Sequence, residues 1–150
     1  MSNDRKVTKD LIQTCKDGSE GFAKAAEKLT EAGESDLATQ FRRFGTERQQ
    51  FASELDDLAK QYGDDADASG SVAAAVHRGW MAVKDVVAGS GDPEGVLDAA
   101  EQGEDHAKSE YAKALDEDIS PTLRSVVQRQ YAAVQHAHDT VRDLRDAHAA

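Results

Sequence analysis

The sequence predicts an all-α protein, a bundle of four long helices with a fifth, shorter helix. Three observations lead to this fold class. Alanine contributes 25 of the 150 residues and proline only two, a composition that favours helix. The large apolar residues recur at the three- and four-residue spacing of one helix face. No segment shows the two-residue alternation of a half-buried strand.

The core of such a bundle must be thin. Leucine, isoleucine, valine and phenylalanine together supply only 26 of 150 residues, and with a net charge of −11 this is close to the composition of a disordered chain. The regular helical spacing of these residues and the abundance of alanine argue against disorder. We therefore expect closely packed helices whose contacts are largely made by alanine.

The charge and the cysteine content exclude several classes of function. Acidic residues outnumber basic ones by 29 to 18, so nucleic acid and anionic membranes would be repelled. No apolar run reaches the length of about 18 residues that crosses a membrane. The first residues lack the apolar core of a signal peptide, and the single cysteine, Cys15, cannot form an internal disulfide. These features predict a cytoplasmic protein with no nucleic-acid or membrane partner.

The first two helices are expected over residues 8–32 and 36–62. Thr8 is a suitable N-cap, and Gly33 stands where a glycine ends many helices. The apolar stripes are Leu11, Cys15, Phe22 and Leu29 in the first helix, and Leu37, Phe41, Phe44, Phe51, Leu55, Leu58 and Tyr62 in the second.

Three further helices are expected over residues 72–88, 93–117 and 121–147. The first of these is the short one, and Trp80 is its expected anchor on the bundle. The last two begin at Asp-Pro and Ser-Pro pairs, which place a capping residue before a proline in the first turn.

The loops decide the expected connectivity. Short loops near residues 33–35 and 117–120 make the first two helices antiparallel, and likewise the last two. A helix over 72–88 would be about 25 Å long, enough to return the chain along the bundle. The result is up-down, crossover, down-up, the connectivity of ferritin-like four-helix bundles. A simple up-down array of five helices is the alternative, and we favour the crossover.

Several strings also resemble a known family. They are "DLIQTCKDGSEGFAKAAEKL", "RQQFASEL", "SVAAAVHRGW", "EQGEDHAKSEYAKAL" and "RQYAAVQHAHDTVRDLRD". Through them the chain resembles, over roughly residues 8–146, a bacterial family catalogued as domain of unknown function 2383 and placed with the ferritin-like proteins. The resemblance implies a ferritin-like bundle in the bacterial cytoplasm and supplies no activity.

Three polar residues interrupt the apolar stripes at one height of the predicted bundle. Arg48 lies between Phe44 and Phe51, and Glu104 and His138 lie within the stripes of the last two helices. A buried arginine needs a carboxylate partner, because an unpaired buried charge is strongly destabilising. We expect an Arg48–Glu104 ion pair with His138 in the same layer, fixing the register of the helices. The alternatives are a degenerate metal layer and a site for a small anion or substrate.

A complete di-iron site is not predicted. Ferritin-like di-iron proteins use inward carboxylates and a Glu-x-x-His motif on each of two helices. Here the strings "ERQQ" and "QHAH" each supply half of that motif. The remaining alternative is a single iron, manganese or zinc ion on Glu104, His138 and Glu101.

The expected function follows from this balance. We expect a non-catalytic helical bundle without a cofactor, which acts as a homo-oligomer or by binding a protein partner. A stress-associated or scaffolding role follows only by analogy with other ferritin-like proteins. The competing class is a metal-binding redox or storage protein with a degenerate site.

Overall fold

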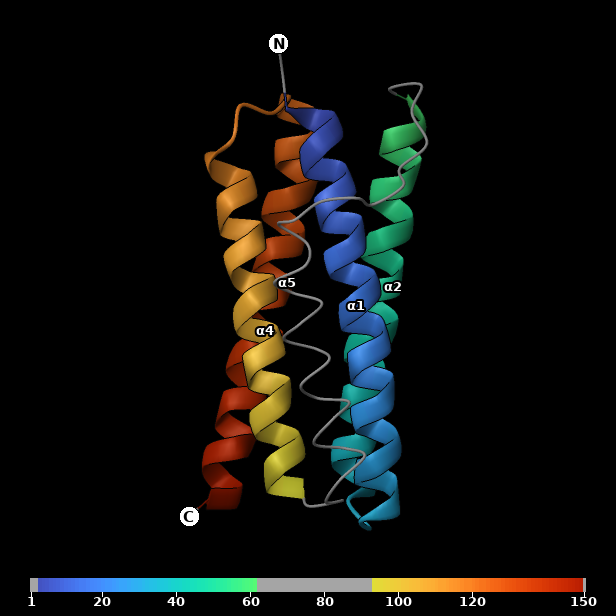
Figure 1. The fold of residues 1–150 in the computed structure, drawn as a ribbon, viewed down its shortest axis with the longest axis vertical. Coiled ribbons are helices and arrows are strands. Elements are labelled where there is room, and N and C mark those ends of the chain that lie inside the picture. The colour runs from blue at the N-terminus through green and yellow to red at the C-terminus, as the bar shows by residue number, and fades with distance from the viewer. Residues whose placement is uncertain (1–2, 62–92, 150) are drawn as a thin grey trace.

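The computed structural model describes residues 3–61 and 93–149, and these residues form four α-helices and no strand (Figure 1). The helices are α1 (Asp4–Glu31), α2 (Ser35–Gln61), α4 (Pro93–Asp116) and α5 (Pro121–Ala149). The all-α prediction is therefore confirmed for this part of the chain. The expected helix over residues 72–88, with Trp80, lies outside the described residues.

The start of α1 lies four residues before the predicted one. Thr8 is inside the helix, where its hydroxyl donates to the carbonyl of Asp4 at 2.6 Å instead of capping. The start of α1 is held by hydrogen bonds to residues more than a hundred positions later in the sequence. The N–H of Asn3 donates to the carbonyl of Asp118, and the N–H of Ser120 donates to Oδ1 of Asp4, both at 2.7 Å. This N-terminal clasp fastens α1 to the α4–α5 loop, a contact that local capping rules do not foresee.

The end of α1 is the predicted glycine stop. Gly33 has a φ of +82°, which a residue with a side chain adopts only with strain. Its N–H donates to the carbonyl of Thr30 at 3.1 Å, and that of Glu34 donates to the carbonyl of Leu29 at 2.8 Å. These two bonds form a Schellman motif, which turns the chain directly into α2.

The four helices close a bundle among themselves. In Figure 1, α1 and α5 run in one direction and α2 and α4 in the other, so each helix is antiparallel to its two packed neighbours. α1 packs against α2 and α4, and α5 packs against α4 and α2, with the α2–α5 pair the least closely packed. The end of α2 and the start of α4 lie at opposite ends of the bundle.

The interior consists of two apolar clusters separated by a polar level. One cluster contains Phe22, Leu29, Leu37, Phe41, Val96, Leu97 and Val141, and the other contains Val7, Leu11, Ile12, Cys15, Phe51, Leu55, Tyr111, Leu123, Val127 and Val134. On every helix the residues between the clusters include a polar residue or a glycine. We call this level, made of Gly18, Arg48, Glu104 and His138, the central layer.

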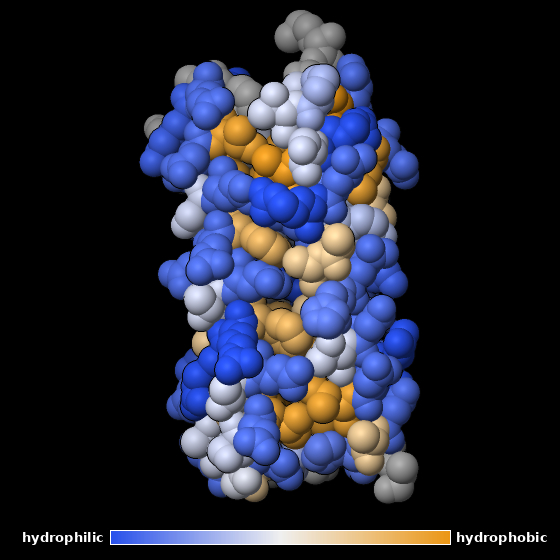
Figure 2. Space-filling model, turned by 180° about the vertical axis from the view of Figure 1, so that it is seen from behind, coloured by the Kyte–Doolittle hydropathy of each residue, from blue (hydrophilic) through white to orange (hydrophobic). Residues whose placement is uncertain are grey.

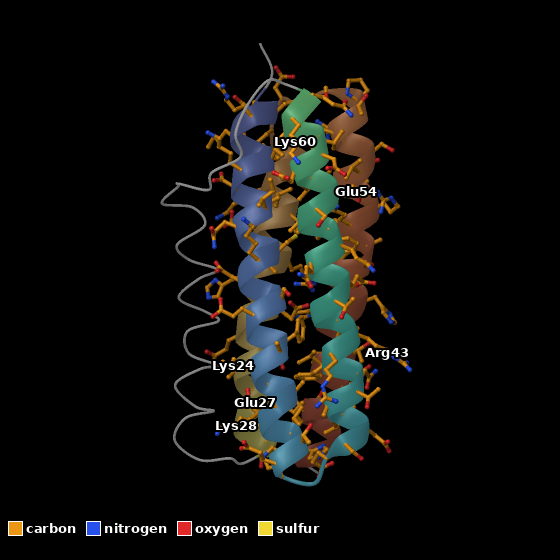
Figure 3. All side chains as sticks on the ribbon, turned by 90° about the vertical axis from the view of Figure 1, so that its right-hand side faces the viewer. Lys24, Glu27, Lys28, Arg43, Glu54 and Lys60 are labelled. Atoms are coloured by element: carbon orange, nitrogen blue, oxygen red, sulfur yellow. The ribbon has the colours of Figure 1, made fainter. Side chains whose placement is uncertain are left out.

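The outer faces of α1 and α2 carry charged side chains, several of which are labelled in Figure 3. Along α1, Lys24 lies 3.8 Å from Glu27, and Lys28 lies 3.3 Å from Glu31. Such exposed pairs each contribute less than about 1 kcal/mol, so the stability of the bundle must come from its interior. None of the helices described is long and apolar enough to cross a membrane.

Candidate functional site

The centre of the bundle is occupied by an ion pair between α2 and α4. Nη1 of Arg48 donates to Oε1 of Glu104 at 2.7 Å, and Nη2 donates to Oε2. The two side chains are 1% and 0% exposed. Because the guanidinium engages both carboxylate oxygens, Glu104 is committed to arginine and is not free to bind a cation.

The neighbouring helix α1 is shaped to receive this arginine. A Cβ atom at Gly18 would lie only 3.1 Å from Nη1 of Arg48, so a glycine at this position leaves room for the guanidinium. One turn further on, the ring of Phe22 lies 5.4 Å from Cζ of Arg48, in cation–π contact. The pair therefore joins three helices, with Arg48 reaching from α2 between α1 and α4.

Arg48 keeps its positive charge in the interior. Burial alone would lower the pKa of the Arg48 guanidinium, but the adjacent Glu104 carboxylate outweighs this effect and raises the pKa above its usual value. The arrangement is suited to fixing helix register, since breaking it would strand a charge in an apolar core.

A second buried polar feature lies beside the pair, and the sequence reasoning missed it. The phenol of Tyr111 donates to Oε1 of Gln130 at 2.7 Å and lies 3.0 Å from Sγ of Cys15, which is placed to donate in turn to the phenol oxygen. The side-chain amide of Gln130 donates to Oε1 of Glu54 at 2.8 Å. We call these four residues the hydrogen-bond chain; it crosses all four helices.

Burial has a clear effect on two titratable groups of the hydrogen-bond chain, Cys15 and Tyr111. It raises the pKa of the Cys15 thiol to about 11, against smaller lowering effects from Tyr111 and Arg48. It also raises the pKa of Tyr111, with a further contribution from Cys15. Both groups are therefore protonated at neutral pH, and Cys15 is a buried hydrogen-bonding thiol rather than a reactive one.

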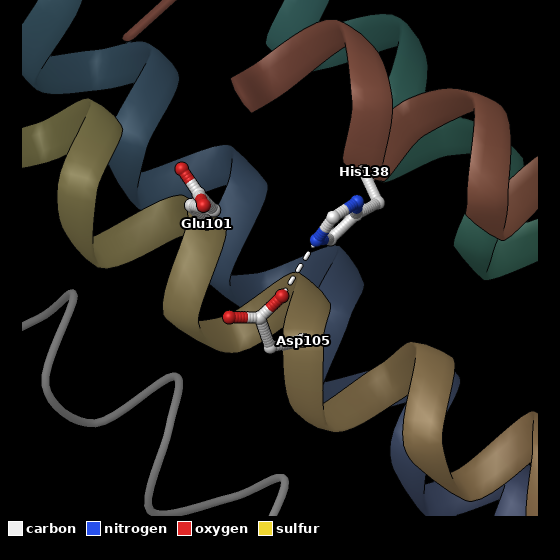
Figure 4. A group of neighbouring side chains, drawn as sticks. All are labelled: Glu101, Asp105 and His138. Carbon is white, nitrogen blue, oxygen red and sulfur yellow. Dashed lines mark hydrogen bonds and ion pairs between the residues drawn. The ribbon is translucent and has the colours of Figure 1, made fainter. Parts of the chain in front are cut away.

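His138 contacts two carboxylates that the sequence did not single out. It lies in the central layer by position, but its Nε2 is 2.6 Å from Oδ1 of Asp105 and its Nδ1 is 3.1 Å from Oδ1 of Asp139. Glu101 lies one turn before Asp105 on α4 (Figure 4). Ligand atoms of Glu101, Asp105 and His138 all lie within 4.8 Å of one another. We call these three residues the rim cluster.

The predicted ligand set of Glu104, His138 and Glu101 must therefore be corrected at one position. Each helical residue is rotated by about 100° from its predecessor, so Glu104 points into the core while Asp105 points to the edge where His138 lies. The sequence singled out Glu104 because it interrupts the apolar stripe. Asp105 has no such signal, because it is an ordinary acidic residue on a polar face.

Chemically, the Arg48–Glu104 pair and the rim cluster differ in what they can do. In the Arg48–Glu104 pair the two opposite charges neutralise each other. The rim cluster offers one imidazole nitrogen and two carboxylates, which are ligands for a divalent cation.

Comparison with known proteins identifies the family. Residues 6–117 match the family described as a domain of unknown function (DUF2383), a span that begins two residues inside α1, includes α2 and α4, and ends before α5. No curated protein and no solved structure gives a significant match. The match contains Arg48 and Glu104, whereas His138 lies beyond it. Since well over half of the chain lies within the match, the protein belongs to the DUF2383 family.

Proposed function

We propose that the protein is a non-catalytic ferritin-like bundle, in the cytoplasm, that acts by associating with itself or with a protein partner. The observation that carries this proposal is the Arg48–Glu104 pair. Di-iron bundles place their metal between facing helices, on inward carboxylates. Here an arginine takes up the inward carboxylate, and its positive charge opposes a cation at the same position.

The face formed by α2 and α5 supports an associating role. Figure 2 shows apolar side chains gathered along the seam between these two helices. A surface groove of about 730 Å³ on this face is lined by Leu58, Val126 and neighbouring polar residues of α2. Phe44 and Leu144 are further half-buried apolar residues on the same two helices. An apolar seam with a polar border is typical of a protein–protein contact.

The finer connectivity is part of the same proposal. The four described helices pack into a bundle among themselves, and the end of α2 and the start of α4 lie at opposite ends of it. We propose that residues 72–88 form the crossover helix on the outside, anchored by Trp80. Trp80 is the single tryptophan, so its fluorescence reports on this segment alone. We expect Trp80 to emit at short wavelength and to be quenched poorly by iodide. Emission at the wavelength of a solvent-exposed tryptophan would contradict the anchoring role of Trp80.

Light scattering across a range of concentrations tests the association. We expect a dimer or a larger assembly that Val126→Glu converts to monomers, and a control substitution at the exposed Lys24 of α1, away from this face, that leaves it intact. A strictly monomeric wild-type protein would contradict self-association. In-cell cross-linking in the native host would then decide whether a different protein is bound.

The competing function is a metal-dependent redox or storage protein. Metal analysis of protein purified without chelator separates the two classes. Near-stoichiometric iron or manganese would overturn the non-catalytic proposal, whereas only traces of these two metals are the result we expect.

A further inference from the structure

We propose that the rim cluster of Glu101, Asp105 and His138 is a binding site for one Zn²⁺ ion, which joins α4 to α5. This goes beyond an associating bundle, because it gives the protein a ligand. It also differs from a di-iron centre, since it lies at the edge of the bundle and uses neither Arg48 nor Glu104.

The first argument is geometry. Glu101 and Asp105 are four residues apart on α4 and so share one face, and His138 reaches them from α5. Ligands about 2.0–2.2 Å from a tetrahedral zinc ion lie about 3.3–3.6 Å from one another. The longest separation between the three ligand atoms is within 4.8 Å. Small side-chain rotations would therefore bring all three onto one ion, with the remaining position left for water.

The second argument is the orientation of the imidazole. The side chain of His138 is only 9% exposed, and its Nδ1 lies 3.1 Å from Oδ1 of Asp139. With Nδ1 engaged in this way, Nε2 faces Asp105. A carboxylate on the far nitrogen of a histidine is the usual support of a metal-ligating imidazole, because it fixes both the ring and the tautomer.

The third argument is access. Asp105 is 59% exposed, whereas Glu101 and His138 are largely buried. An ion can therefore enter from the solvent side at Asp105 and be held against two side chains of restricted motion. An exposed acidic cluster alone would lack such fixed ligands.

Arg145 is the natural competitor of the ion. Its Nη1 lies 2.6 Å from Oε2 of Glu101, and it also lies 3.0 Å from Asp146 and 3.7 Å from Asp98. When Glu101 binds a cation, Arg145 keeps these two other carboxylates as partners. We therefore expect Arg145→Ala to tighten Zn²⁺ binding rather than weaken it.

The donor set selects the class of metal. One imidazole and two carboxylates suit Zn²⁺, whereas Mg²⁺ and Ca²⁺ prefer all-oxygen sites. Millimolar Mg²⁺ should therefore fail to displace Zn²⁺ from the protein.

The test is a titration of the metal-free full chain with Zn²⁺ alone, in competition with a chromophoric chelator. We expect one ion per chain, and at least about tenfold weaker binding in Asp105→Asn, Glu101→Gln and His138→Gln. Loss of the supporting carboxylate in Asp139→Asn should weaken binding by about 10–100-fold. Matched controls on the exposed surface of α5 are His136→Gln and Asp143→Asn, which should bind as the wild type does.

A second measurement distinguishes a loss of metal binding from a loss of folding. Asp105→Asn changes an exposed side chain, so its circular dichroism should match that of the wild type while the rise in melting temperature with Zn²⁺ is lost. Absence of Zn²⁺ binding by the wild type would overturn the proposal, as would binding that survives both Asp105→Asn and His138→Gln. The oligomeric state is measured separately, so failure of this site leaves the association proposal standing.

Discussion

The interior of the bundle and its edge hold acidic residues in two different environments. In the interior, Glu104 is fully buried and both of its oxygens are engaged by Arg48. At the rim, the next residue in the chain, Asp105, is 59% exposed and faces a histidine. The two carboxylates are neighbours in sequence, yet one belongs to a closed charge pair and the other to an open group of metal ligands. The rotation of about 100° between successive helical residues makes this difference.

The comparison shows that burial, more than residue type, decides what a carboxylate does. A buried carboxylate has no water around it and needs a permanent partner of opposite charge. The resulting ion pair in the interior therefore has a structural role. A charge at the edge retains water and can exchange one partner for another. If the interior excludes water from its polar groups, substitutions there should have the following effects.

The largest effect is expected from Glu104→Ala. It strands the buried guanidinium of Arg48 and should lower the free energy of unfolding by about 3–5 kcal/mol, as measured by urea unfolding. The matched rim change, Asp105→Asn in metal-free protein, should cost no more than about 1 kcal/mol. Replacing both Arg48 and Glu104 with leucine should cost much less than the sum of the single changes. A cost below about 0.5 kcal/mol for Glu104→Ala would show that the interior pair is not closed.

A pH dependence should come from Cys15, whose pKa is raised to about 11 in the folded protein from 9.0 in the unfolded chain. Below pH 9 both states carry the proton, so this contribution to stability is complete. As the pH rises from 9 to 11 the unfolded state loses the proton first, and about 2–3 kcal/mol should be lost. The difference between unfolding curves of wild type and Cys15→Ala isolates this slope. Parallel curves over that pH range would contradict the burial of the thiol.

Tyr111→Phe should have a smaller effect. It removes the hydroxyl that links Cys15 to Gln130 and leaves the Gln130 carbonyl oxygen without its donor, at a cost of about 1–3 kcal/mol in thermal or urea unfolding. Tyr131→Phe is the control, because the half-buried ring of Tyr131 stacks on Tyr111 at 6.5 Å and the substitution keeps this contact. Equal costs for the two changes would place the hydroxyl of Tyr111 in contact with water.

The smallest effect is expected from Gly18→Ala. Alanine favours helix over glycine by about 1 kcal/mol, but its Cβ would lie 3.1 Å from a guanidinium nitrogen that Glu104 holds in place. We expect a net loss of about 1 kcal/mol in the wild type. In the protein with leucine at both positions 48 and 104, the same change should become stabilising. A stabilising Gly18→Ala in the wild type would mean that the arginine can move aside.

The sequence predicted the four described helices well, because caps and apolar spacing are local signals. The Ser120-Pro121 start and the Gly33 stop lie where these signals place them. Thr8 was misjudged because its competitor, the N-terminal clasp, comes from residues more than a hundred positions away. No local rule contains that contact.

The site was harder to predict from the residues. Arg48 and Glu104 are visible because each breaks an apolar stripe. Cys15, Tyr111 and Gln130 are not, since cysteine and tyrosine count as apolar in such a stripe, and glutamine reads as surface. Asp105 is hidden for the opposite reason, because an acidic residue on a polar face is common. Only the packing of α4 against α5 brings it to His138.

The placement of the first and last helices has a mechanical consequence. α1 begins at one end of the bundle and α5 ends at the other (Figure 1). A force applied between them acts along the helix axes and loads the interfaces of α1 and α5 in shear. Helices that slide past each other must break many side-chain contacts together, whereas helices pulled apart from one end release them one turn at a time. Copies joined end to end would thus resist stretching. The Arg48–Glu104 pair, which joins α2 to α4, would have to break before these two helices could slide past each other.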